Sequence, residues 1–278
     1  IYDLVLNRDI IYSSDKITTQ DETLNIKLSN QYILKACCNL FQITHKVMYL
    51  SISNCDVKEL QPNCYENEFR HITYEIDFSF NQIEVISKGT FKKLQVVQIQ
   101  LQSNLIKAIE NEAFLNLSNL NTVDLANNLL HTINPHAFLD VPVLFSLYFH
   151  CNNVELLEKG NFNFLGECQA YIDLSNNNIS FLDSGVFERT VAGTLSVDLS
   201  ANALESVTEN VFDNYIFEHI DLGCNPIVEL SRLYENNSSI SYVYVNTTFL
   251  DRVNFENFVT WANSRNIKLE ESSCVGKE

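Results

Sequence analysis

The sequence repeats one pattern of apolar residues every 23 to 26 residues along most of its length. In residues 120–138, LNTVDLANNLLHTINPHAF, apolar side chains surround a central asparagine, Asn128, at fixed offsets. We call the position of this asparagine the slot. Turns in the same register place the slot at Gln31, Cys55, Asn81, Asn104, Asn128, Asn152, Asn177, Asn202, Asn225 and Thr248. Self-similarity at this period is the mark of a solenoid, so the sequence predicts a stack of about ten turns.

The residues of one turn indicate its local structure. Val123 and Leu125 alternate with polar neighbours, which is typical of a short strand with one buried face. The chain must then bend, and a buried Asn128 side chain can satisfy the backbone groups that the bend leaves unpaired. Phe138 comes ten residues later and fills the space behind the strand. Since one turn cannot bury its own apolar edge, stacked turns form a parallel sheet. We therefore expect an α/β repeat, a curved solenoid whose sheet lines a concave face.

Both ends of such a stack need caps. Residues 1–22 carry no repeat, and a capping hairpin is indicated by loose alternation at Leu4, Leu6, Ile10 and Tyr12. At the other end a short helix is predicted by helical spacing of Phe255, Phe258, Val259 and Ala262, with a strand at Ile267–Leu269 to follow. The expected organisation is one continuous domain, with an N-terminal cap at 1–22, the array at 23–258 and a C-terminal cap at 259–278.

The repeat unit LxxLxLxxNxLxxLxxxxF resembles the typical extracellular class of leucine-rich repeats. That class includes Toll-like receptor ectodomains, small proteoglycans and the leucine-rich immune proteins of insect haemolymph. The resemblance covers about residues 23–258. It implies a leucine-rich-repeat solenoid that binds proteins, sometimes lipids or glycans presented with proteins, through its concave face or a rim. The paired-cysteine signature of the usual C-terminal cap is missing, because Cys224 stands alone before Asn225.

The charge of the chain restricts its partners. The formal net charge is −17, which argues against nucleic acid because phosphate binding needs a basic face. The acidic residues are concentrated in the second half of the chain, with a net charge of −4 over residues 1–139 and −13 over residues 140–278. A protein partner with a basic surface would be steered to the second half, although solubility alone also accounts for this charge.

Sequence signals for location favour the extracellular space. Five glycosylation sequons begin at Asn116, Asn178, Asn236, Asn237 and Asn246. Together with eight cysteines they indicate a secreted glycoprotein. No apolar run reaches the roughly 18 residues of a membrane helix, so no membrane insertion is expected in this segment. The start of the chain lacks a signal-peptide pattern and is expected to belong to a mature protein or an excised ectodomain.

The repeat positions of the cysteines suggest which of them pair. Facing positions on neighbouring turns make Cys38 with Cys64 one candidate disulfide, and a shared rim makes Cys224 with Cys274 another. Cys55 occupies a buried slot and can be a small core residue. Cys151 and Cys168 fall on opposite rims, so we expect at least one cysteine, such as Cys151, to stay unpaired or to join a partner chain. The CxxC spacing of zinc sites is absent, and no metal is expected.

Repeat geometry also predicts which side chains line the concave face. They flank the two buried strand residues of each turn, at six, four and two positions before the slot. In the second half these positions give a candidate binding patch of Tyr148, His150, Tyr171, Asp173, Asp198, His219, Asp221, Tyr242 and Tyr244. Tyrosine is a favoured interface anchor, and the acids complement a basic surface. Two alternatives stay open: the aspartates belong to the scaffold, or a rim, the outer face or a cap binds instead.

No motif of catalysis or cofactor binding is present. G-x-S-x-G, H-E-x-x-H and a glycine-rich phosphate loop are all missing, and neither an enzyme nor a cofactor is expected. The first interpretation is a secreted recognition or scaffolding protein of invertebrate innate immunity, which rests on the resemblance and on the asparagine-rich, glycine-poor composition. The others are a matrix protein of the small-proteoglycan type and the ectodomain of a membrane receptor. A homodimer or heterodimer is compatible with each.

Overall fold

The computed structural model consists of two compact units, Ile1–Leu130 with Asn134–Leu144 (unit 1) and His131–Ile133 with Phe145–Glu278 (unit 2). The single continuous domain expected from the sequence stays a prediction. The residues described by the structure are 2–6, 24–29, 35–36, 47–62, 72–165, 169–187, 193–207, 211–212, 216–230, 233, 239–246 and 249–271.

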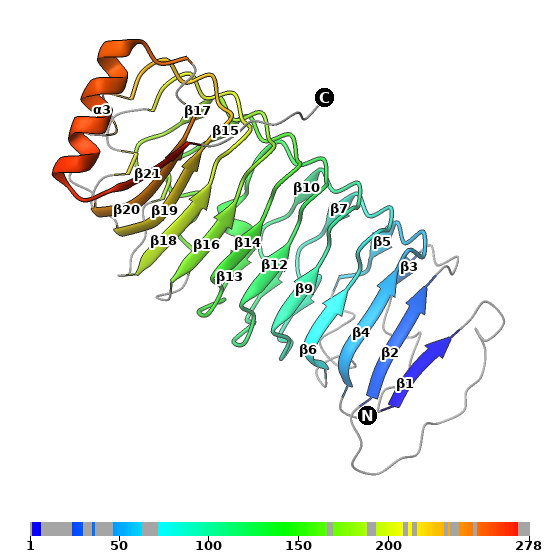
Figure 1. The fold of residues 1–278 in the computed structure, drawn as a ribbon. Helices are drawn as coiled ribbons and strands as arrows, with labels where there is room; N and C mark the ends of the chain where they lie inside the picture. Colours follow the sequence, from blue (N-terminus) through cyan, green and yellow to red (C-terminus); the bar gives the residue numbers. More distant parts are fainter. Residues whose placement is uncertain are drawn as a thin grey trace. The chain divides into compact units, whose positions relative to one another are not determined.

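Unit 1 is a stack of parallel strands joined by return segments (Figure 1). Its main sheet runs in chain order through β1 (Tyr2–Leu6), β2 (Leu24–Ser29), β4 (Val47–Ser53), β6 (Ile72–Asp77), β9 (Gln98–Gln100) and β12 (Thr122–Asp124). The return segments pair through short parallel strands, namely β3 (Lys35–Ala36) with β5 (Glu59–Leu60), β7 (Val85–Ile86) with β10 (Ala108–Ile109), and β8 (Phe91–Lys92), β11 (Phe114–Leu115) and β13 (Phe138–Leu139) with one another. A 3-10 turn, η2 (Pro135–Ala137), precedes β13.

Unit 2 repeats this construction and has a helix before its last strand (Figure 1). Its main sheet contains, in order, β14 (Ser146–Tyr148), β16 (Ala170–Asp173), β18 (Thr194–Asp198), β19 (Ile216–Leu222), β20 (Ser239–Val245) and β21 (Lys268–Glu271), all parallel. The return strands β15 (Leu156–Leu157) and β17 (Phe181–Leu182) pair with each other. Helix α3 (Arg252–Ser264) lies between β20 and β21 in sequence. The predicted leucine-rich-repeat solenoid with parallel strands is therefore confirmed.

The slot residues form the predicted hydrogen-bonded ladder. Eight of the ten slots fall in the described residues and all eight are buried, whereas Gln31 and Thr248 lie outside them. Asn128 is representative: its Oδ1 accepts the backbone N–H of Ile106 at 2.9 Å, and its Nδ2 donates to the carbonyl oxygens of Leu101 and Leu125 at 3.1 and 3.0 Å. Asn128 thus binds its own turn and the turn before it, which fixes the register of neighbouring strands. The same bond to the preceding turn is made by Asn81, Asn104, Asn177, Asn202 and Asn225.

The phenylalanines ten residues after the slots stack behind the strands. In unit 1 Phe114 lies between Phe91 and Phe138, with ring centroids 5.2 and 4.7 Å away. Unit 2 has an equivalent column of Phe162, Phe187 and Phe212, spaced at 5.8 and 5.9 Å. All six rings are buried. The two columns fill the space opposite each sheet, as the repeat pattern predicts.

The ends of the chain differ from the expected caps in two respects. Strand β1 pairs in parallel with β2, Leu4 opposite Ile26, so it extends the main sheet by one strand, which the sequence did not predict. The expected second hairpin strand at Ile10 and Tyr12 lies outside the described residues. At the other end α3 begins at Arg252, before the predicted cap boundary at 259, because the Asp251 side chain accepts the N–H of Asn254 and starts the helix there. The predicted helix followed by a strand is confirmed.

Within the described residues, no helix has both the length and the apolar character needed to cross a membrane.

Candidate functional site

The sheet of unit 2 brings the candidate binding residues together. Parallel pairing places Tyr148, Asp173, Asp198, Asp221 and Tyr244 opposite one another in one row across the strands. A second row contains Ser146, Tyr171, Ser196, His219, Tyr242 and Lys268. None of the nine predicted side chains is buried. We call this set the acidic–aromatic face: Tyr148, His150, Tyr171, Asp173, Asp198, His219, Asp221, Tyr242 and Tyr244.

Each of the three aspartates on this face also closes a turn of the backbone. An Oδ1 atom accepts the N–H of the residue two positions later, from Ser175 to Asp173 at 3.0 Å and from Ser200 to Asp198 at 2.8 Å. Asp221 accepts the N–H of Gly223 in the same way at 2.8 Å. The scaffold role that the sequence left open therefore exists. It does not remove the negative charge, because these carboxylates stay on the exposed side of the sheet.

Burial, with a smaller contribution from the neighbouring negative charges, raises the pKa of two groups on this face. Burial raises the pKa of Asp221 to about 6, and the nearby Asp198 charge adds to this rise, while the Gly223 hydrogen bond opposes it. Burial also raises the pKa of Tyr171, with Asp173 and Asp198 contributing in the same direction. Both shifts have the sign expected where positive charge is scarce. A cation brought to this face would relieve the repulsion.

Aromatic rings pack in pairs along the face. Tyr148 and Tyr171 lie 5.7 Å apart at a tilt of 56°. His219 stacks on Tyr242 with centroids 4.6 Å apart and an interplanar angle of 18°. The Lys268 ammonium lies 4.9 Å from the Tyr242 ring centroid and donates to its hydroxyl at 3.1 Å. The face thus holds one cation of its own against an aromatic ring.

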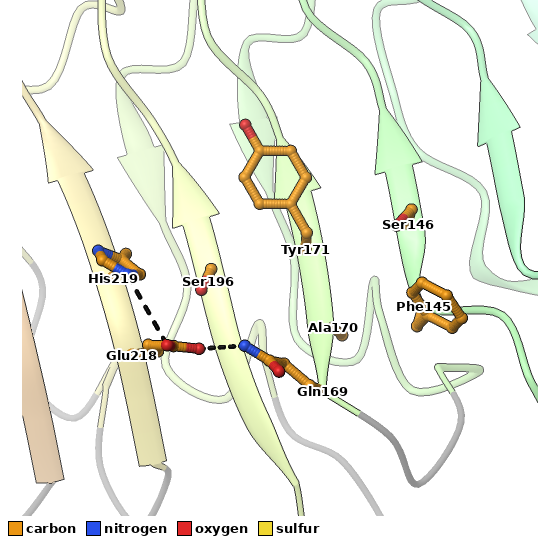
Figure 2. Close-up of a pocket in the computed structure, with 8 residues that line it drawn as sticks. All are labelled: Phe145, Ser146, Gln169, Ala170, Tyr171, Ser196, Glu218 and His219. Atoms are coloured by element: carbon orange, nitrogen blue, oxygen red, sulfur yellow. Dashed lines mark hydrogen bonds and ion pairs between the residues drawn. The ribbon is translucent and has the colours of Figure 1, made fainter.

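An open depression of about 510 Å³ lies on the same face (Figure 2). Short side chains leave it hollow, since Ser196 stands between the larger Tyr171 and His219. Glu218 accepts a hydrogen bond from Gln169 at one side and lies 3.9 Å from His219 Nε2. The residues that line the depression are Phe145, Ser146, Gln169, Ala170, Tyr171, Ser196, Glu218 and His219.

Glu218 was not among the predicted residues because a bulge brings it to the site. The pairing of β18 with β19 shifts by one residue, so that Leu195 faces Phe217 and Ser196 faces His219. The extra residue in β19 is Glu218, and bulges commonly redirect side chains beside binding sites. The sequence alone does not reveal the shift, because Phe217 and Ile220 are separated by two residues, as are the corresponding residues of the repeat unit in other turns. Ser196 lies six residues before Asn202, in the predicted concave column, and was not selected because its side chain is small. Gln169 was missed because it lies eight residues before Asn177, where the repeat unit has an apolar residue.

The cysteines and sequons fall partly outside the described residues. Cys224 takes part in a disulfide; its expected partner Cys274 lies outside them, as do Cys38, Cys64 and Cys168, so both proposed pairings stay predictions. Cys151 is an exposed free thiol, and Cys55 is buried. Asn116 and Asn178 are exposed and Asn246 is half-buried, whereas Asn236 and Asn237 are not described. Across the described ranges no three His, Cys, Asp or Glu side chains are grouped to hold a metal ion.

Comparison with known proteins gives matches of limited length in sequence and wide coverage in structure. The sequence model of a family described as leucine rich repeat matches residues 95–154. Human Toll-like receptor 5 is 32% identical over 112 residues, which cover 38% of this chain and 13% of the receptor. The chain therefore spans a small part of this relative.

Three solved structures share the fold. The Drosophila Toll–Spätzle complex aligns with a TM-score of 0.64 at 18% identity, covering 90% of this chain and 33% of the other. A complex of TLR13 with the single-stranded RNA ssRNA13 aligns with a TM-score of 0.61 at 17% identity, covering 90% and 39%. The APL1 leucine-rich repeat domain aligns with a TM-score of 0.60 at 16% identity, covering 91% and 61%.

Proposed function

We propose that this chain, which is a leucine-rich-repeat protein resembling Toll-like receptor ectodomains, binds a protein partner through the acidic–aromatic face of unit 2. The partner presents a basic surface. The interaction is one of recognition or scaffolding, without a catalytic step.

One observation carries the proposal: three carboxylates stand on adjacent strands between tyrosines. Asp173, Asp198 and Asp221 are paired neighbours, about 4.8 Å apart from strand to strand. The repulsion between these three carboxylates favours a partner with positive charge. Tyr148 and Tyr244 flank the three acids in the same row. Tyrosine contributes large contact area with a polar end, and is enriched among the residues that dominate interface energy.

Charge also favours protein over nucleic acid as the partner. TLR13 was solved with a single-stranded RNA, so the fold alone leaves both classes open. A nucleic acid that approached unit 2 would be repelled, because residues 140–278 carry a net charge of −13. Binding of phosphates depends on lysine and arginine, which release the counterions of the nucleic acid. We therefore propose a protein.

The location and the biological setting are part of the proposal. The chain acts outside the cell, as a secreted protein of invertebrate innate immunity. The disulfide at Cys224 and the exposed sequons at Asn116 and Asn178 support an oxidising, glycosylating route. Similarity to the Toll structure, described as a hub in development and innate immunity, supports the immune setting. A membrane receptor ectodomain is the second candidate, favoured by the match to Toll-like receptor 5.

The proposal is tested by retention of partners from native extracellular fluid. The immobilised chain carries its natural glycans and disulfides, and a Tyr148→Ala/Tyr171→Ala/Tyr244→Ala variant is run in parallel. A Tyr49→Ala/Tyr74→Ala variant serves as the matched control, because these two rings pair at 5.2 Å on the sheet of unit 1. Circular dichroism melting checks that each variant is folded.

We expect a protein that is retained by the native chain and the control, and lost by the triple variant. Equal retention by all three forms would contradict the assignment of the face. Retention of RNA and of no protein would contradict the class of partner. A transmembrane segment encoded downstream in the full-length transcript would replace the secreted form by the receptor ectodomain.

A further inference from the structure

We propose that the gap above Ser196, between Tyr171 and His219, is a binding slot for an arginine side chain of the protein partner. This inference rests on the proposed function and deepens it, since it names the chemical group that the face recognises. We call this gap the Ser196 slot; it is a space on the sheet surface and is distinct from the asparagine slots of the repeat.

The width of the slot fits a flat group between two rings. Tyr171 and His219 lie two strands apart with Ser196 between them, which gives about 9.6 Å from backbone to backbone. A planar group that contacts a side chain on each of its two faces needs about 7 Å, at roughly 3.5 Å for each contact. Ser196 is short enough to leave this space open, and it lines the depression together with both rings (Figure 2).

Carboxylates stand at both ends of the slot. Glu218 lies at the amino-terminal end, where the hydrogen bond from Gln169 holds its side chain across the neighbouring strand (Figure 2). Asp198 follows Ser196 by two residues on the same strand and therefore faces the same side of the sheet. A cation in the slot therefore lies between two aromatic side chains and near two carboxylates.

The same row already holds one cation of this protein. Lys268 is the strand neighbour of Tyr242, and its ammonium lies 4.9 Å from the centre of that ring. Tyr242 in turn stacks on His219, which forms one wall of the slot. This internal contact shows that the row can hold a positive group against an aromatic face. The Ser196 slot lies further along the same row, and no lysine or arginine is among the described residues that line it.

Two walls favour arginine over lysine. A guanidinium is planar, stacks on aromatic faces and still has N–H donors in its plane for carboxylates at its edges. An ammonium is compact and touches one ring at a time, as Lys268 does. The geometry of the slot therefore selects the flat cation.

The test uses small blocked amino acids and backbone amide NMR on the isotope-labelled, disulfide-intact chain. The probes are N-acetyl-arginine amide, N-acetyl-lysine amide and N-acetyl-citrulline amide; citrulline has nearly the shape of arginine and no charge. We expect millimolar binding of the arginine probe, with shifts of the Ser196 and His219 amides, and binding about tenfold weaker for the other two.

Variants connect this binding to the slot. Ser196→Leu fills the gap and should abolish the shifts. Glu218→Gln keeps an acceptor for Gln169 but loses the charge, and should weaken the arginine probe about three- to tenfold. Thr122→Leu, at the corresponding position on the sheet of unit 1, should change nothing.

Three results would overturn the inference: no shift at Ser196 or His219, equal binding of the citrulline probe, or full binding by Ser196→Leu. Failure here is separable from failure of the proposed function. If the tyrosine variant loses a protein partner while the arginine probe does not bind, the face stands and the slot is wrong. If the probe binds but no protein is retained from native fluid, the slot stands and the proposed function is wrong.

Discussion

Single residues of the acidic–aromatic face serve the fold and the surface at once. The carboxylates of Asp173, Asp198 and Asp221 each accept the backbone N–H of the residue two positions later. This hydrogen bond stabilises the bend that follows the strand in each repeat. Stacked on adjacent strands, the same carboxylates repel one another. Stability and binding are therefore opposed at these positions, and substitution can separate them.

Asp221 should make the protein less stable as the pH rises. Its folded-state pKa of about 6 lies above its usual value of 3.8, so between these values the folded state binds more protons than the unfolded state. The contribution of Asp221 to the free energy of unfolding therefore falls from about pH 4 to about pH 6 and stays lower above that. Asp221→Asn should remove this slope and raise the melting temperature at pH 7 by about 3 °C.

Thermal melts of the native chain and the variant between pH 4 and pH 7 check this prediction. Glu155→Gln, at an exposed position of unit 2, is the control for loss of one charge. Parallel pH profiles for the native chain and Asp221→Asn would show that this carboxyl is not the source of the slope.

The slot asparagines should be far more sensitive than the surface asparagines. Asn128→Ala leaves the N–H of Ile106 and two carbonyl groups without their buried partner, and should cost about 2–4 kcal/mol. Asn128→Asp retains the acceptor but places a buried carboxylate oxygen against two carbonyl oxygens, so a cost at least as large as that of Asn128→Ala is expected. The exposed Asn119→Ala should change stability by less than about 0.5 kcal/mol. Urea unfolding measures all three, and equal costs at Asn128 and Asn119 would refute the ladder.

At the scale of elements, helix α3 closes unit 2 through one face. Phe258 and Ala262 are fully buried, while Phe255 is 41% exposed on the same helix. Phe258→Ala should therefore destabilise unit 2 by about 3–5 kcal/mol, and Phe255→Ala by less than about 1 kcal/mol. Urea unfolding followed by circular dichroism distinguishes the two. A cost at Phe255 as large as that at Phe258 would mean that α3 packs by another face.

Strand elements also show what the sequence could predict. The period placed Tyr148, Asp173 and Tyr244 in one row correctly, because a repeated slot fixes the position of every residue before it. It could not place Glu218, since the bulge in β19 depends on pairing with β18, while Phe217 and Ile220 keep the ordinary spacing of the repeat. The parallel pairing of β1 was missed for a related reason: one strand without a slot does not reveal its direction.

At the scale of the whole molecule, charge and aromatic side chains coincide in one half of the chain. Residues 140–278 carry a net charge of −13, and the nine residues of the acidic–aromatic face belong to this half. Long-range attraction of a basic partner depends on ionic strength, whereas aromatic contacts depend on it weakly. Association with the partner should therefore slow with added salt more than dissociation speeds up, which surface plasmon resonance at several salt concentrations can measure.

Oxidative footprinting of tyrosines tests most directly whether unit 2 is the binding half. The chain is labelled by hydroxyl radicals alone and in complex with the protein it retains, and each tyrosine is quantified by mass spectrometry. We expect labelling of Tyr148, Tyr171 and Tyr244 to drop in the complex. Tyr49 and Tyr74, which are both 37% exposed on the sheet of unit 1, should be labelled equally in both states. Protection of Tyr49 and Tyr74 with unchanged labelling of the three tyrosines in unit 2 would contradict the proposed binding face.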